Sequence, residues 1–162
     1  MVDAGIIKGV ADDKFAPSAQ ITRADFAILL VRAWDLTAED AGEFADVADS
    51  DYFAKEVGIA SALGIVHGVG EGKFAPKAPI TREQMMVMLA RTLEAVKAEV
   101  KEVEDDVLAD FTDAADISAY AVDAVKAMVG NSFIQGANGK INPKGNATRA
   151  EVAVLLDRIL NK

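Results

Sequence analysis

Apolar residues along this chain fall into two kinds of helical pattern. Three runs, residues 26–34, 85–93 and 152–160, are apolar nearly all round, which is typical of helices buried on every side. Two further runs, 54–63 and 121–129, have apolar residues close to helical spacing. The pattern therefore predicts three central helices and two outer helices, each outer helix preceding a central one.

Local signals predict where these helices begin and end. A threonine precedes each central run, at Thr22, Thr81 and Thr148, and an aspartate, a glutamine or a glutamate follows it three residues later. In such a capping box the two side chains bond backbone N–H groups that the helix leaves unpaired. Gly64 and Gly130 stand after the outer runs, where glycine is favoured because it readily takes a positive φ.

The same motifs occur three times along the chain. The copies are GIIKG, KFAP and ITRAD at residues 5–9, 14–17 and 21–25; GIVHG, KFAP and ITREQ at 64–68, 73–76 and 80–84; and SFIQG, KINP and ATRAE at 132–136, 140–143 and 147–151. The cap threonines lie 59 and then 67 residues apart. Short helical units of this kind cannot bury their apolar faces alone, so the repeats must pack on one another.

A further element occurs in the second and third copies but not in the first. It reads FADV at 44–47 and FTDA at 111–114, with an aromatic–alanine pair nine residues after each phenylalanine. A charged segment over 93–106 accounts for the longer interval, and its valine spacing predicts a helical extension that runs into a polar linker. The sequence thus predicts an all-α fold of three helix-loop-helix repeats: residues 1–41, which lack the first helix, 42–103, with the extension, and 104–162.

Composition excludes several classes of protein. The 162 residues carry a net charge of −9, whereas nucleic-acid binding requires clustered lysine and arginine. The chain has no cysteine and a single histidine, His67, so neither a disulfide framework nor a Ser-His-Asp or Cys-His catalytic group is supported. No apolar run approaches the roughly 18 residues of a membrane span. The acidic run at 46–51 lacks the glycine and final glutamate of a calcium loop. We expect no metal, no cofactor and no catalytic residue.

The arginine after each cap threonine is the main candidate for a binding site. Arg23, Arg82 and Arg149 occupy the first helical position, where a cation opposes the helix dipole at a cost of about 0.3–1 kcal/mol. One explanation is an internal salt bridge to an acid such as Asp46 or Asp113. The other is an anion site, because a guanidinium and a helix N-terminus both attract a carboxylate or phosphate. The two are compatible, since an acid can orient an arginine that also meets a ligand.

Three aromatic residues are candidates for stacking on a sugar ring. We expect Phe53 to be buried in the core instead. The hydroxyl groups of Tyr52 and Tyr120 favour partial exposure, which leaves these two rings available to a ligand.

Taken together, these motifs resemble the S-layer homology repeat, and the resemblance covers almost the whole chain. It implies three repeats folded as a pseudo-threefold helical prism with grooves between adjacent repeats. It further implies a non-catalytic module that binds secondary cell-wall polysaccharide, often pyruvylated, on the outer surface of bacteria. Such a module anchors S-layer proteins and surface enzymes without a covalent bond.

The resemblance also implies which residues contact the ligand. They are the arginines of the Thr-Arg motif, the aspartates of the Phe-x-Asp motif and the loop glycines, where a side chain would crowd the sugar or stiffen the loop: Arg23, Arg82, Arg149, Asp46, Asp113, Gly9, Gly68 and Gly136. Three residues depart from the family pattern, namely Gln84, Ser132 and Ile141. We expect the best groove to be one built from Arg23 or Arg82 with an intact neighbouring repeat.

The absent first helix leads to a further expectation. A prism that lacks one outer helix should expose apolar surface near Ile6, Ile7 and the central helices, and such a patch often marks association. We therefore expect a homo-oligomer, a swapped element or a partner segment that covers it. Two other functions stay open: a structural, self-assembling module without glycan binding, and a fragment of an enzyme whose catalytic domain lies outside this chain.

Overall fold

Helices make up the regular structure of this chain. The computed structural model describes residues 19–39 and 43–161. Within these ranges the elements are, in order, α1 (Arg23–Ala33), α2 (Ala54–Ala62), α3 (Arg82–Ala95), the 3₁₀-helices η2 (Ala114–Asp116) and η3 (Ala119–Ala121), α4 (Val122–Gly130) and α5 (Arg149–Leu160). The described ranges contain isolated β-bridges but no sheet, which confirms the all-α fold class.

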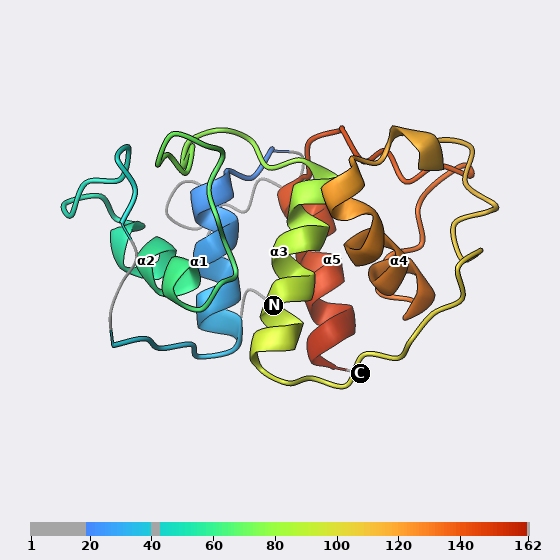
Figure 1. Cartoon of the computed structure of the whole chain (residues 1–162), viewed down its shortest axis with the longest axis horizontal. Coiled ribbons are helices and arrows are strands. Elements are labelled where there is room, and N and C mark those ends of the chain that lie inside the picture. Colours follow the sequence, from blue (N-terminus) through green and yellow to red (C-terminus); the bar gives the residue numbers. More distant parts are fainter. Residues whose placement is uncertain (1–18, 40–42, 162) are drawn as a thin grey trace.

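The central helices α1, α3 and α5 run alongside one another and begin at the same end of the molecule (Figure 1). α2 packs against α1, and α4 packs against α3. Each central helix begins at its predicted cap, because the hydroxyls of Thr22, Thr81 and Thr148 accept the N–H of the third helical residue. At Thr81 the capping box is complete, since its own N–H donates to Gln84 Oε1 at 3.0 Å.

A closed ring of backbone hydrogen bonds joins the three repeats just before the central helices. The N–H of Ile21 donates to Ala147 O at 3.2 Å, that of Ala147 to Ile80 O at 2.9 Å, and that of Ile80 to Ile21 O at 3.0 Å. These three residues each directly precede a cap threonine. The ring relates the repeats by a pseudo-threefold axis and holds the three helix N-termini in one plane.

Side chains from all the helices meet in one apolar core. The rings of Phe26, Phe53 and Phe74 are at most 2 % exposed, so the prediction of a buried Phe53 is confirmed. Truncating a ring buried in this way costs about 3–5 kcal/mol. The single histidine, His67, is exposed at the surface.

The charged segment after α3 is not the predicted helical extension. α3 ends at Ala95, and Lys97 takes the left-handed conformation with φ +57°, which turns the chain away from the helix axis. Residues 98–104 then contain no helix. Asn131 fixes this segment against the end of α4: its Oδ1 accepts Lys101 N–H at 2.9 Å and its Nδ2 donates to Lys101 O at 3.0 Å.

Gly130 does not end α4 in the way predicted. It is the last helical residue, and the left-handed position falls two residues later on Ser132, with φ +62°. A Cβ on Gly130 would lie 2.1 Å from Val103 Cγ1, so glycine is needed there because the linker crosses the helix closely. Gly64, in contrast, has φ +77° and follows α2 as predicted.

Several expectations about the first repeat lie outside the described residues, among them Gly9, Ile6 and Ile7. None of the helices in the described ranges is long and apolar enough to cross a membrane.

Candidate functional site

The first backbone N–H groups of α1 and α3 are already occupied within the protein. In α1, the N–H of Arg23 donates to Ala78 O at 2.9 Å and the next N–H donates to Pro76 O at 3.0 Å. The third, of Asp25, donates to the cap hydroxyl at 3.1 Å. In α3 the same three groups donate to Gly145 O, Pro143 O and Thr81 Oγ1 at 2.9, 3.0 and 3.3 Å. These backbone N–H groups are therefore unavailable to a ligand, and the arginine side chains are left as the candidate anion-binding groups of the two helix starts.

Arg23 is a buried cation that has no carboxylate partner in residues 19–39 and 43–161. Its Nε donates to Phe74 O at 2.9 Å, and its guanidinium carbon lies 4.8 Å from the centre of the Phe74 ring. The residue is 6 % exposed. Among the residues that the structure describes, no carboxylate lies within 4.0 Å of its guanidinium. Burial lowers the pKa of Arg23, while Tyr120 and Asp46 act in the opposite direction.

Arg82, the equivalent residue of α3, is neutralised by an internal acid. Its Nε donates to Glu151 Oε2 at 2.8 Å, and its Nη2 contacts Glu151 Oε1. This bidentate geometry makes arginine–carboxylate pairs strong. Arg82 lines a groove of about 820 Å³ between α3, α5 and the loop that contains Gly136 and Ile141. Arg149 occupies the equivalent position in α5, where its N–H donates to Ala19 O at 3.0 Å.

Asp46 and Asp113 bind loop backbone rather than the arginines. Asp46 accepts the N–H groups of Phe74 and Ala75 at 2.9 and 2.8 Å. Asp113 accepts those of Ile141 and Asn142 at 2.9 and 2.7 Å. Burial tends to raise the pKa of each aspartate, but these backbone bonds outweigh it and the net pKa is lowered. The expected salt bridges to Asp46 or Asp113 are absent from the described arginine contacts, because both carboxylates hold the loops in place.

The loop glycines are required by packing inside the protein. Gly68 has φ +85°, and a Cβ on it would lie 2.5 Å from Lys73 O and 2.9 Å from Phe44 Cε1. Gly136 repeats this arrangement, with φ +73° and with Lys140 O and Phe111 Cε1 at 2.7 and 2.8 Å. The phenylalanine of each Phe-x-Asp motif therefore covers the glycine of the following loop, and this contact accounts for both glycines without a ligand.

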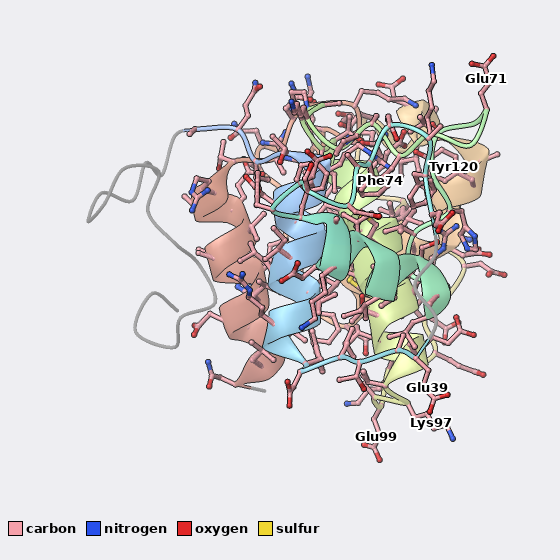
Figure 2. The ribbon with its side chains drawn as sticks, turned by 90° about the vertical axis from the view of Figure 1, so that its left-hand side faces the viewer. Glu39, Glu71, Phe74, Lys97, Glu99 and Tyr120 are labelled. Carbon is pink, nitrogen blue, oxygen red and sulfur yellow. The ribbon has the colours of Figure 1, made fainter. Side chains whose placement is uncertain are left out.

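Tyr52 and Tyr120 are exposed, as predicted. Tyr52 is 70 % and Tyr120 is 59 % exposed. The Tyr52 hydroxyl donates to Asp25 Oδ1 at 2.6 Å, and burial together with this carboxylate raises the pKa of Tyr52 to about 12. Figure 2 shows Phe74 and Tyr120 toward the end of the molecule at which the central helices begin. Burial raises the pKa of Tyr120, with Glu83 adding to the rise, so Tyr120 lies within electrostatic reach of both Arg23 and Glu83.

A buried polar cluster beside Tyr120 was not predicted from the sequence. Glu83 is 3 % exposed and accepts Ser118 N–H, Ser118 Oγ–H and Lys144 Nζ at 2.9, 2.7 and 2.8 Å. Burial tends to raise the pKa of Glu83, but Lys144 and Ser118 lower it overall. The sequence carried one signal: the other two repeats have alanine where Glu83 stands. The cluster ties α3 to the third repeat at two points.

The acidic run at 46–51 does not form a metal site. Asp46 is bound to the loop, and Asp51 Oδ2 accepts Ala48 N–H at 2.9 Å. Within residues 19–39 and 43–161, no three carboxylate or histidine side chains converge in a way that could hold a metal ion.

The outer side of α5 is the one central-helix face in the described ranges that carries a large exposed apolar side chain. Ile28, Val87 and Val154 each stand six residues after their cap threonine. Ile28 is 7 % and Val87 is 6 % exposed, whereas Val154 is 49 % exposed. α1 is packed against α2 and α3 against α4, whereas the described residues include no outer helix packed against α5 in this way.

Comparison with known proteins agrees with this architecture. The profile of the S-layer homology domain matches residues 1–27, 43–86 and 110–153. The chain is 34 % identical over 160 residues to an amylopullulanase of Thermoanaerobacterium thermosulfurigenes, covering 97 % of this chain and 8 % of that protein. It is 34 % identical over 159 residues to an endoglucanase of Bacillus sp. (97 % and 16 %), and 33 % identical over 164 residues to the surface-layer 125 kDa protein of Lysinibacillus sphaericus (99 % and 13 %).

The chain thus spans a small part of each of these relatives, and the activities in their names belong to the whole proteins. The three profile matches are three tandem repeats, the first of them incomplete. The chain therefore belongs to the S-layer homology domain family and is a module of the bacterial cell surface.

Proposed function

We propose that this chain anchors the protein that carries it to the cell wall by binding an acidic, often pyruvylated, secondary polysaccharide in a groove between repeats. Arg23 supports this proposal most directly, as a nearly buried guanidinium without an acidic partner among the described residues. Two relatives are named as enzymes and one as a surface-layer protein. A region shared by such different proteins suits a role in attachment, and we assign no catalytic step to it.

The energetics of Arg23 favour an anionic ligand. Taking a guanidinium out of water is costly unless an opposite charge lies close to it. A carboxylate about 4 Å away contributes roughly 4 kcal/mol of attraction at the effective dielectric constant of a partly buried site, before the ligand's own desolvation is subtracted. Charge-assisted hydrogen bonds to the guanidinium are also about twice as strong as neutral ones. A pyruvate ketal or a phosphate on the glycan would supply such a charge.

The other candidate residues then have two kinds of role. Tyr120, exposed and near Arg23, is placed to stack on a sugar ring. Asp46 and Gly68 act indirectly, by fixing the loop whose Phe74 carbonyl and ring hold Arg23. We propose the same indirect role for Asp113 and Gly136 in the neighbouring groove.

Binding to purified cell-wall sacculi tests the anchoring function. The wild-type chain should sediment with sacculi that retain their polysaccharide and not with sacculi stripped of it. Arg23→Ala should abolish sedimentation. Arg32→Ala is the matched control, because Arg32 lies at the other end of α1 in an exposed ion pair with Glu56. Sedimentation that does not depend on the polysaccharide, or that Arg23→Ala leaves intact, would refute the proposal and favour a self-assembling scaffold.

We further propose that a helix covers the outer face of α5. Its chemistry follows from α2 and α4, which pack against α1 and α3: an amphipathic helix preceded by a Phe-x-Asp motif. Adding a synthetic peptide of residues 110–131 tests this, and it should bind the wild-type chain but not Val154→Asp. If the peptide does not bind and light scattering shows a compact monomer, the proposal of a covering helix is wrong.

A further inference from the structure

The third residue of α3 and the third residue of α5 have different partners. In α5, Glu151 directs its carboxylate to the Nε and Nη2 of Arg82. In α3, Gln84 directs its Oε1 to the N–H of its own cap, Thr81, at 3.0 Å. Both residues follow their cap threonine by three positions. One position in the repeat therefore supports two different arrangements.

Glu151 lies opposite Arg82, and the pseudo-threefold relation places Gln84 opposite Arg23 in the same way. The N–H of Arg82 donates to Gly145 O, and that of Arg23 donates to Ala78 O, both at 2.9 Å. Gly145 and Ala78 each stand three residues before the cap threonine of the next central helix. Each arginine is thus joined in the same way to the loop that leads into the next helix, and the third residue of that helix is its natural partner.

The two arginines differ in whether an acid compensates their charge. Arg82 borders a groove of about 820 Å³, which is large enough for a sugar unit. Its positive charge, however, is already compensated by Glu151. Gln84 is uncharged and remains on its own cap, so Arg23 keeps its charge for a ligand. A carboxylate gains more from a guanidinium than a neutral amide does, because both partners of the pair are then charged.

We propose that the third residue of α3 and of α5 decides whether the arginine of the preceding repeat can bind an anionic glycan, with Gln84 leaving the charge of Arg23 uncompensated and Glu151 compensating that of Arg82. This inference rests on the proposed function, because it assigns that function to one of two structurally related grooves. The ligand class is a glycan that bears a carboxylate or a phosphate.

Exchanging the two residues tests the proposal. Gln84→Glu should weaken binding by about tenfold, because the new carboxylate competes with the ligand for Arg23. The variant should fold normally, since glutamate at this position is as good a capping-box residue as glutamine. Thr37→Glu is the matched control, because it adds the same charge at an exposed position beyond the C-terminal end of α1. Glu151→Gln should add binding that the further substitution Arg82→Ala removes.

The probe is the methyl glycoside of a 4,6-pyruvylated hexose, titrated calorimetrically into each variant, with sacculi sedimentation in parallel. A wild-type chain that binds neither the probe nor sacculi overturns the proposed function and this inference with it. A wild-type chain that binds while Gln84→Glu binds equally well overturns this inference alone. The inference is also overturned if Glu151→Gln gains no additional binding that Arg82→Ala then removes.

A second readout needs no glycan. The ¹⁵N–¹H signal of Arg82 Nε should shift on Glu151→Gln, because this substitution removes the carboxylate to which that N–H donates. Gln84→Glu should shift the Arg23 Nε signal, because it places a carboxylate opposite Arg23. An Arg23 signal unchanged by the substitution means that residue 84 does not face Arg23, and the proposal fails.

Discussion

Alanine in place of Gly68 would carry two energetic costs, one for a positive φ and one for a steric clash, and comparison with Gly64→Ala separates them. Gly64 and Gly68 both have positive φ, +77° and +85°. Alanine in this conformation is destabilised by roughly 1–2 kcal/mol. A Cβ on Gly64 meets nothing within 4 Å, whereas a Cβ on Gly68 lies 2.5 Å from Lys73 O and 2.9 Å from Phe44 Cε1. Gly64→Ala therefore carries the conformational cost alone.

The additional cost of Gly68→Ala comes from overpacking against a backbone carbonyl that cannot move aside. Overpacking of a tight site costs about 1–3 kcal/mol, so we expect a total loss of about 2–5 kcal/mol for Gly68→Ala against about 1–2 kcal/mol for Gly64→Ala. Urea unfolding followed by circular dichroism measures both differences. Gly68→Ala should also weaken sacculus binding, because this loop carries Phe74, which holds Arg23. Equal losses of stability in the two variants would refute the account of the loop glycine.

Three further predictions concern charge and exposure. The pKa values of Asp46 and Asp113 are lowered in the folded protein, so the ionised carboxylates stabilise the fold above the unfolded pKa of about 4, and this stabilisation is lost as the pH falls through the folded pKa values. The urea concentration at the unfolding midpoint should therefore decrease as the pH is lowered. It should decrease less steeply in Asp46→Asn, which lacks one of the two carboxylates. Val154→Asp should change the free energy of unfolding by less than about 0.5 kcal/mol, since this side chain is 49 % exposed, whereas Val87→Asp should cost at least about 3 kcal/mol or prevent folding. In a spectrophotometric titration, Tyr52 should ionise near pH 12, and Tyr52→Phe should remove that step.

The sequence predicted the features that depend on neighbouring residues. Cap threonines, helical periodicity and the glycine after α2 are local signals, and the structure confirms them. The repeat pattern also predicted three related units, which the family profile matches.

Contacts between distant residues could not be predicted in the same way. Arg82 and Glu151 are 69 positions apart, and only the pseudo-threefold packing brings them together. Gln84 was recognised as a departure from the family pattern, but its significance depends on knowing which arginine the position faces. The helix N-termini looked open in the sequence because the carbonyls that occupy them come from the next repeat.

The most direct test of the central claim is a calorimetric titration of purified cell-wall polysaccharide into the wild-type chain and into Arg23→Ala. Each protein is titrated with the native polysaccharide and with polysaccharide whose acidic groups have been converted to neutral amides. The account predicts that neutralising the glycan and removing Arg23 each abolish most of the binding, and that doing both adds little more, because the two charges belong to one contact. If the neutralised polysaccharide binds as tightly as the acidic one, Arg23 does not bind an anionic group and the account of this site is wrong.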